Sequence, residues 1–429
     1  MNNPAGREQA FELDRADLLA PLRSEYHIPR LADGTDSVYL CGHSLGLQPK
    51  ATAGILTAEL DSWAQRGVAG HFDSARPWLS YHEQLAAGLA QLTGAKPMEV
   101  VAMNSLSVNL HLMLVSFYNP TAERHQILIE KRAFPSDRYA VESQILQRGF
   151  DPADSLLEIA PRSGEATVTT EDVCEAIELH GKRIATVVLP GVQYLNGQRF
   201  DIATITDCAH RHGCIVGWDL AHAIGNTPLE LHDWNADFAV WCSYKYLNAG
   251  PGAIGGCFVH ERHAHATQLP RFAGWWGQQK STRFAMPEDF TAIPGAEGWQ
   301  ISNPPVLAAA PLIASLDLFG KTTMAALRAK SIALTAYLES SLHLLAPQSI
   351  TVLTPRDPDE RGCQLSLRLQ VEPARAREIH IELERRGFIC DWREPDVIRA
   401  APVPMYNTFT DVWRFATELA HQVKMATFT

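Results

Sequence analysis

The sequence predicts an α/β fold with one large and one small domain. Short apolar runs alternate with helical stretches between residues 99 and 260, which is typical of a mostly parallel sheet covered by helices on both faces. With 429 residues, the chain is long enough for more than one core. After residue 305 a long helical stretch leads into shorter strand-like and helical segments, which indicates a smaller α+β domain.

The large domain is expected to hold the sheet. Its predicted strands are Glu99–Met103, Gln126–Glu130, Ile184–Pro190, Ile215–Asp219, Phe238–Cys242 and Gly255–His260. Its predicted helices cover 136–148, 170–182 and 203–213, after a helical region over 51–93 that is interrupted near Gly67, Gly70 and Pro77. Glycine and proline are expected to break a helix at such points.

The two ends of the chain are expected to form the N-terminal arm and the small domain. The start holds an acidic helical arm over 12–25 and a short strand at 38–40. The end holds a helical stretch over 305–345, strands at 349–353 and 364–369, a helix over 374–386, an apolar run at 388–391 and a closing helix from Thr410. The predicted division is an arm (1–45) that joins the small domain, a large domain (46–305) and a small domain (306–429).

Composition restricts the class of protein. Lys and Arg number 37 and Asp and Glu 48, so the formal charge is −11, which argues against nucleic acid or an anionic membrane as the main partner. No stretch approaches the roughly 20 apolar residues of a membrane helix, and the first residues lack a signal-peptide pattern. Eight cysteines occur without CxxC pairs. We therefore expect a cytoplasmic protein with reduced thiols.

A lysine and an aspartate stand at the ends of two predicted strands. Lys245 follows the apolar run Phe238–Cys242, and Asp219 ends the run from Cys214. Because ligands bind at the carboxyl ends of parallel strands, both side chains are expected to face one pocket. A partly buried salt bridge would explain the pair. Alternatively, a partly desolvated lysine suits a Schiff base, and a carboxylate that keeps a pyridine nitrogen protonated completes the requirements of pyridoxal phosphate.

Two further segments suit such a cofactor. The segment from Asn104 to Asn109 contains Ser105 and Ser107 just before an apolar helix, and free N–H groups at a helix start bind anions such as phosphate. Phe134, Pro135, Ser136 and Asp137 follow another strand, where the aromatic ring could stack on a flat cofactor. Plain helix capping explains either segment taken alone.

An arginine is expected if the substrate is an amino acid, because a guanidinium binds a carboxylate with two hydrogen bonds. Arg399 precedes the segment Ala-Ala-Pro-Val-Pro, whose prolines restrict the loop. Ser44, within Cys-Gly-His-Ser-Leu-Gly, is a second candidate for the same carboxylate.

Taken together, these stretches resemble the kynureninase family of fold-type-I pyridoxal-phosphate hydrolases. The similarity extends over nearly the whole chain. It rests on NSLSVNLHLML, AFPSDRYAVESQ, GWDLAHAIGN, WCSYKYLNAGPG, STRF, ISNPP and RAAPVPMYN, in the order of the family.

The resemblance implies hydrolysis of L-kynurenine, and of 3-hydroxy-L-kynurenine as a second substrate, to anthranilate (or its 3-hydroxy form) and L-alanine. It implies that Lys245 binds pyridoxal 5'-phosphate covalently, that Asp219 pairs with the ring nitrogen and that Tyr244 contacts the phosphate and transfers a proton. Other implied cofactor contacts are Leu106, Ser107, Phe134, Pro135, Ser136, Asp137 and His222. Arg399 and Ser44 match the substrate carboxylate site, and His71 and Asn303 match the site of its aromatic end.

The resemblance also implies a homodimer with shared active sites, because Trp275 and Asn303 match residues that reach the cofactor of the neighbouring subunit. Two positions depart from the family pattern. His43 stands where asparagine is usual, and Pro190 stands where a serine near the cofactor is frequent.

Three other classes remain as alternatives. A cysteine desulfurase or aminotransferase shares the fold, but desulfurases usually place histidine directly before the lysine, where this chain has Tyr244. A zinc enzyme is suggested by the histidines at 260, 263 and 265, but position 264 is alanine and the HExxH spacing fails. A non-catalytic relative would not be expected to keep Lys245, Asp219, Tyr244 and Arg399 together.

Overall fold

A seven-stranded sheet forms the centre of the larger part of the molecule. The computed structural model describes residues 6–427, so the first five residues of the predicted arm and the last two of the chain lie outside the described residues. The strand order is β2-β8-β7-β6-β5-β3-β4. Strand β8 pairs antiparallel with both β2 and β7, and the pairs from β7 to β4 are parallel. The strands are β2 (Val100–Ala102), β3 (Gln126–Glu130), β4 (Leu156–Ile159), β5 (Ile184–Pro190), β6 (Ile215–Asp219), β7 (Phe238–Trp241) and β8 (Gly256–Val259).

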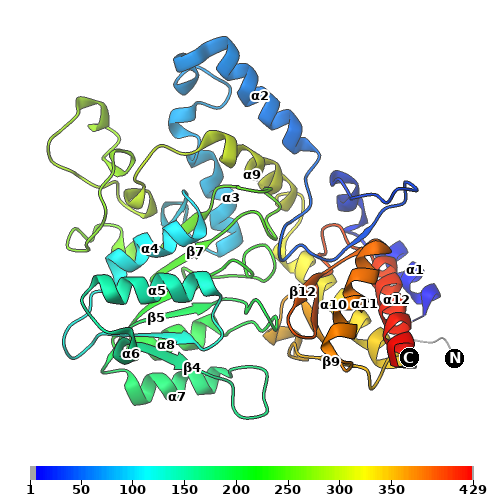
Figure 1. The fold of residues 1–429 in the computed structure, drawn as a ribbon. Helices are drawn as coiled ribbons and strands as arrows, with labels where there is room; N and C mark the ends of the chain where they lie inside the picture. Colours follow the sequence, from blue (N-terminus) through cyan, green and yellow to red (C-terminus); the bar gives the residue numbers. More distant parts are fainter. Residues whose placement is uncertain (1–5, 428–429) are drawn as a thin grey trace.

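Helices cover both faces of this sheet (Figure 1). Because side chains alternate along a strand, Val187 packs into one core and Val188 into another. The helices of this part are α2 (Ala51–Arg66), α3 (Glu83–Thr93), α4 (Leu106–Phe117), α5 (Pro135–Gln147), α6 (Pro152–Ser155), α7 (Thr170–His180), α8 (Ile202–Arg211) and α9 (Val306–Phe319). The prediction of an α/β fold with near-continuously apolar strands is confirmed by these two cores.

The C-terminal part has its own sheet and its own core. Four antiparallel strands run in the order β12-β13-β10-β9. Its elements are α10 (Met324–Leu345), β9 (Ile350–Val352), β10 (Leu365–Leu369), α11 (Pro373–Arg385), β11 (Phe388–Ile389), β12 (Asp391–Arg393), β13 (Val397–Ala400) and α12 (Phe409–Thr427).

The N-terminal segment packs on this C-terminal part. Helix α1 (Arg7–Ala16) lies beside α12 (Figure 1), and strand β1 (Val38–Tyr39) pairs in parallel with β11. Ala10 and Val38 belong to the same core as the strands of the small sheet. Helix α9 packs instead against α2 and α3 of the larger part. The predicted domain bounds stay a prediction.

The structure differs from the expected elements in several places. Strands β4 and β13 and helix α6 were not expected, and the single helical stretch over 305–345 is two helices, α9 and α10, separated at residues 320–323. The helical arm expected over 12–25 is instead helix α1 followed by a 3-10 helix at Ala20–Glu25. Short 3-10 helices complete the description: Ala20–Glu25, Gly67–His71, Trp78–Ser80, Pro97–Glu99, Glu261–His263, Trp275–Gly277, Arg283–Ala285, Ala296–Trp299 and Pro358–Glu360.

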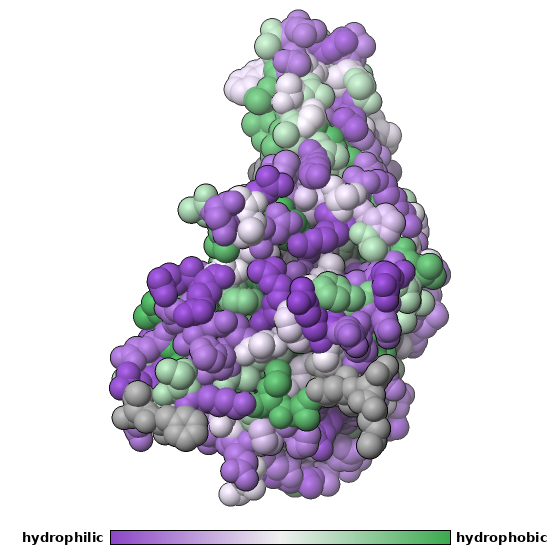
Figure 2. Space-filling model, turned by 90° about the vertical axis from the view of Figure 1, so that its right-hand side faces the viewer, coloured by the Kyte–Doolittle hydropathy of each residue, from purple (hydrophilic) through white to green (hydrophobic). Residues whose placement is uncertain are grey.

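Within residues 6–427, no single helix is long and apolar enough to cross a membrane, although the bent pair α9 and α10 passes that test by length and composition. The face of the molecule in Figure 2 is mostly hydrophilic.

Candidate active site

Lys245 lies on the turn that follows β7, at the carboxyl edge of the sheet. Its Nζ is 3.1 Å from Nε2 of His222. The same Nζ lies 5.9 Å from the ring centroid of Phe134 and 5.8 Å from that of Tyr244. The amino group is therefore surrounded by two aromatic rings and an imidazole, and it forms no salt bridge with any residue that the structure describes.

Asp219 ends β6 and lines the same cavity as Lys245. Its Oδ1 accepts a hydrogen bond of 2.6 Å from the N–H of Ala221. Burial raises the pKa of Asp219, while the Lys245 ammonium and the Ala221 N–H oppose that rise. Burial and the neighbouring Asp219 charge raise the pKa of Asp137 well above its ordinary value. The two carboxyls share one buried environment, and Oδ1 of Asp137 has no hydrogen-bond partner.

Two helix N-termini meet at this cavity. Asn104 adopts the left-handed conformation (φ 46°) directly before Ser105, the N-cap of α4. Neither α4 nor α5 has a side-chain cap hydrogen bond. In α5, Pro135 has no N–H and the Asp137 N–H donates to the Phe134 carbonyl at 2.9 Å, so the N–H groups that stay available are mainly those of the first turn of α4 and that of Ser136. Oγ of Ser107 in α4 lies 2.5 Å from Oγ of Ser136 in α5. This arrangement favours an anion beside the two serines.

One cavity, called here the lysine cavity, collects nine of the predicted residues. These nine are Leu106, Ser107, Phe134, Ser136, Asp137, Asp219, His222, Tyr244 and Lys245; Glu130, Pro190, Val192, Tyr194 and Ala221 complete the lining. Pro135 is the first residue of α5 between two of them. Burial, followed by the charge of Lys245, lowers the pKa of His222, and burial raises that of Tyr244.

Arg399 lies next to this cavity in β13 and is only 1% exposed. Its Nε is 2.7 Å and its Nη2 2.6 Å from Oδ2 of Asp391, and Nη1 donates to the Tyr194 carbonyl at 2.5 Å. Nη2 also lies 3.4 Å from Oγ of Ser44. The structure thus brings Arg399 and Ser44 together, with Asp391 balancing the charge. The ring of Tyr194 meets Phe134 edge-on at 5.2 Å and joins this pair to the lysine cavity.

The remaining predicted residues lie apart from the lysine cavity in the single chain. His71 and Asn303 line a second pocket of about 160 Å³ together with Trp63, Trp78 and Trp276. Trp275 is 44% exposed, and its indole N–H donates to the carbonyl of Arg283.

The two departures from the family pattern are both close to the site. Pro190 lines the lysine cavity. His43 is fully buried, neither ring nitrogen has a hydrogen-bond partner, and its ring centroid lies 6.5 Å from that of His222. Burial lowers the pKa of His43 well below its ordinary value, which favours the neutral imidazole.

Sequence reasoning missed Glu130, Tyr194 and Asp391. Glu130 carried a usable signal, because it ends a buried strand as Asp219 does. Tyr194 and Asp391 carried none, since their contacts join segments that are far apart in the chain.

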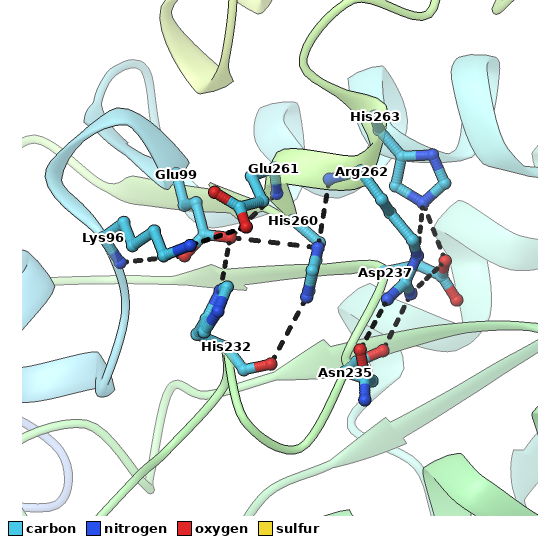
Figure 3. Close-up of polar contacts among 9 residues, drawn as sticks. All are labelled: Lys96, Glu99, His232, Asn235, Asp237, His260, Glu261, Arg262 and His263. Carbon is cyan, nitrogen blue, oxygen red and sulfur yellow. Dashed lines mark hydrogen bonds and ion pairs between the residues drawn. The ribbon is translucent and has the colours of Figure 1, made fainter.

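Two of the three histidines of the rejected zinc motif, His260 and His263, belong to a different network at β8 (Figure 3). Oε1 of the buried Glu99 accepts hydrogen bonds from His232 Nδ1 at 2.9 Å and from the Glu261 N–H at 2.8 Å. Nδ1 of His260 accepts from the Arg262 N–H at 3.1 Å, and its Nε2 lies 3.3 Å from the His232 carbonyl. Both nitrogens of His260 thus have protein partners, so the cluster ties β8 to its neighbours.

Comparison with solved structures shows the fold. The chain superposes with a TM-score of 0.75 on a C-DES variant with glycine covalently linked to its PLP cofactor, at 18% identity and covering 90% of this chain and 96% of that one. It matches the cysteine desulfurase CsdA from Escherichia coli with a TM-score of 0.75, at 17% identity over 96% of this chain and 98% of that one. The fold is that of the fold-type-I pyridoxal-phosphate enzymes.

Sequence comparison identifies the family. The Kynureninase C-terminal domain profile matches residues 327–419. The chain is 56% identical to the kynureninase of Myxococcus xanthus (strain DK1622), over 96% of both chains. It is 54% identical to that of Xanthomonas euvesicatoria pv. vesicatoria (strain 85-10), over 98% of this chain and 99% of the relative. The chain belongs to the kynureninase family.

Proposed function

We propose that the chain hydrolyses L-kynurenine to anthranilate and L-alanine with pyridoxal 5'-phosphate as cofactor. The observation that carries this proposal is the lysine cavity. It combines the amino group of Lys245, the carboxyl of Asp219 and the N-termini of α4 and α5, which have no side-chain cap. Kynureninase relatives at 54–56% identity over nearly the whole chain supply the substrate.

The residues present fit this cofactor. Ser107, Ser136 and the first turns of α4 and α5 would hold the phosphate, and Phe134 would stack on the ring. Asp219 would pair with the ring nitrogen, and positive charge there would favour its ionised form. The unpartnered Oδ1 of Asp137 and Nδ1 of His222 leave buried polar atoms for the edge of the ring.

The residues of the chain then control proton transfer. The cofactor supplies a carbonyl carbon that reacts with amines and a ring that withdraws electrons. Lys245, released when the substrate amine replaces it, would take the α-proton as general base. Tyr244 is the proposed proton donor to the carbon of the departing alanine portion, because burial raises its pKa and keeps the phenol protonated. Its position beside Lys245 puts both groups at one reacting centre.

Arg399 would bind the substrate α-carboxylate, with Ser44 as a second contact. Fixing that carboxylate orients the bonds around the α-carbon relative to the cofactor ring, which lowers the entropic cost of reaction. The 3.4 Å distance between Arg399 Nη2 and Ser44 Oγ supports this pairing, because a carboxylate could accept from both groups.

His71 and Asn303 would meet the aromatic end of the substrate. Their pocket is lined mostly by tryptophan and aliphatic side chains, which suits a benzene ring. We propose that 3-hydroxy-L-kynurenine is also accepted, since the imidazole and the amide can hydrogen-bond a ring hydroxyl.

We propose a homodimer in which Trp275 and Asn303 reach the site of the neighbouring subunit. Exposed apolar side chains gather around this region, among them Trp63, Phe72 and Phe284. Helix α2 lies in the part of the molecule that protrudes at the top of Figure 1. At the top of Figure 2, apolar side chains lie along one side of this protruding part. Sedimentation of the wild type and of Trp63→Glu tests the proposal, because a buried charge should dissociate the dimer.

The proposed location is the cytoplasm. The eight cysteines are free thiols in the described structure, as expected in a reducing compartment. The formal charge of −11 supports a small molecule rather than a nucleic acid as the ligand.

An absorption spectrum followed by addition of L-kynurenine tests the main proposal. A visible cofactor band that shifts with substrate while anthranilate fluorescence appears is the expected result. A visible band without anthranilate would overturn the substrate assignment and favour desulfurase or aminotransferase chemistry. Against persulfide chemistry, Cys363 and Cys390 are buried (0% and 3% exposed). A protein that stays colourless with added pyridoxal phosphate would overturn the cofactor assignment.

A further inference from the structure

Glu130 lies where the lysine cavity meets a larger cavity that has not been described above. It is the last residue of β3, at the same sheet edge as Pro190 and Asp219. This larger cavity, called here the outer cavity, has a volume of about 700 Å³. It lies between the loops after β3 and β5 on one side and the strands of the small sheet on the other. Glu130 is the one residue that lines both cavities in the described structure. The outer cavity reaches solvent through exposed side chains such as Lys131 and Glu165.

The Glu130 carboxyl is buried without a cation beside it. It is 5% exposed, and it forms no salt bridge within residues 6–427. Nε2 of Gln193 donates to its Oε1 at 3.3 Å and also to the carbonyl of Arg132 at 3.2 Å. Oε1 of Gln193 accepts from the N–H groups of Leu195 and Asn196. This fixed amide orients Glu130 at the boundary of the two cavities.

Burial raises the pKa of Glu130 to about 7, with the Gln193 hydrogen bond opposing and the Asp219 charge adding to the rise. In the lysine cavity the charged or titratable groups are Asp137 of α5, Asp219 of β6, His222, Tyr244 and Lys245. In the outer cavity they are Lys131, Arg132, Glu165, Arg368, Glu394 and Asp396. A carboxyl that titrates near neutral pH can accept and release a proton at working pH.

The proposed reaction must remove one proton per turnover. The hydroxyl of water joins the carbonyl carbon, the bond from that carbon to the β-carbon breaks, and the β-carbon gains a hydrogen to give alanine. Kynurenine and alanine are both zwitterions without net charge. The new anthranilic acid ionises at neutral pH, so one proton is left over.

We propose that Glu130 is the proton carrier between the two cavities: it takes the proton released in the lysine cavity and passes it to water in the outer cavity. This inference rests on the proposed hydrolysis. Glu130 would exchange this proton through water in the lysine cavity, because Asp219 is already assigned to the ring nitrogen, and its proposed role is to move a proton and not to bind the substrate.

Glu130→Gln tests the proposal, because glutamine keeps the size and cannot carry a proton. In dilute buffer at pH 7, kcat for anthranilate formation is expected to fall by about tenfold or more with KM unchanged. Raising the concentration of imidazole should restore kcat, because a small buffer can replace the carrier. Glu165→Gln alters a carboxyl of the outer cavity only and should leave kcat unchanged. An unchanged kcat in Glu130→Gln, or a loss that imidazole does not restore, overturns the proposal.

Two further measurements separate this inference from the proposed function and from misfolding. Glu130→Asp keeps a carboxyl and should lose less kcat than Glu130→Gln. In the cofactor-free protein, the denaturation midpoints of Glu130→Gln and the wild type are compared at each pH from about 4.5 to 7. The midpoint of the variant should rise relative to that of the wild type as pH increases, because only the wild type must ionise a buried carboxyl. A difference that does not change with pH overturns the inference and leaves the hydrolase assignment intact. A wild type that forms no anthranilate overturns the assignment itself.

Discussion

Replacing Arg399 by lysine should weaken substrate binding, and the structure sets the size of the effect. A guanidinium has five N–H donors. Asp391 takes one from Nε and one from Nη2, and the Tyr194 carbonyl takes one from Nη1. Two donors remain, and the one on Nη2 donates to Oγ of Ser44 at 3.4 Å, a contact that a bound carboxylate would replace. These two can hold a carboxylate with a fork of hydrogen bonds.

A lysine has only three donors, and Asp391 and Tyr194 would use them. The substrate carboxylate then loses at least one charge-assisted hydrogen bond, worth about 1.5–3 kcal/mol. KM for L-kynurenine should therefore rise by about 10- to 150-fold. Because lysine keeps the positive charge opposite Asp391, the fold should be retained.

Continuous fluorescence of anthranilate measures KM and kcat for Arg399→Lys. Arg393→Lys is the matched control: Arg393 also contacts Oδ2 of Asp391, at 2.9 Å, but its side chain is 37% exposed. The control should change KM by less than about threefold, as expected for an exposed pair. An Arg399→Lys enzyme with wild-type KM and an intact thermal midpoint would refute the role of Arg399 in carboxylate binding.

Three further predictions concern the cofactor, the backbone and pH. Ser107→Ala should raise the dissociation constant of pyridoxal phosphate by about tenfold or more through loss of a hydrogen bond to an anion, measured by titration of the cofactor-free protein; an unchanged constant would place the phosphate elsewhere. Gly46→Ala puts a methyl group 2.3 Å from the carbonyl oxygen of Lys245 and should lower the free energy of unfolding by about 1–3 kcal/mol, measured with urea; an unchanged value would contradict the close approach. Burial alone would raise the pKa of Glu297, but contacts with His82 and Lys280 lower it to about 2. The ionised carboxylate therefore contributes up to about 3 kcal/mol to the free energy of unfolding above pH 4.5, and this contribution should be lost as pH falls toward 2. Acid denaturation should show this loss in the wild type and not in Glu297→Gln.

The sequence predicted the residues that lie at strand ends. Asp219 and Lys245 follow buried apolar runs, and parallel pairing of β5, β6 and β7 puts such ends at one edge. The helix starts at Ser107 and Ser136 were predictable for the same reason, because each helix follows a strand of that sheet. Local pattern and the parallel topology together were enough to place these residues.

The contacts that complete the site depend on register and on the C-terminal sheet. Strand β13 was expected to be a loop, because the prolines after Arg399 obscure the short apolar run 397–400. Its pairing with β12 puts Arg399 opposite Asp391, a contact between side chains on neighbouring strands that no local pattern shows. Tyr194 lies on an irregular loop and meets Arg399 through a backbone carbonyl, which any residue could provide.

The carboxyl groups of the lysine cavity explain why a bound phosphate would need the N-terminal turns of two helices. Glu130, Asp137 and Asp219 all line it, and Lys245 is its only lysine or arginine. A phosphate would add negative charge to a cavity that already holds three carboxyls, which raises the cost of binding it. The N-terminal turns of α4 and α5 supply partial positive charge and N–H donors without adding a titratable group. Burial also keeps part of the carboxyl charge neutral, since it raises the pKa of each of the three groups. The shortage of cations in this cavity therefore accounts both for the use of two helix N-termini to hold a phosphate and for the raised pKa that lets Glu130 hold a proton.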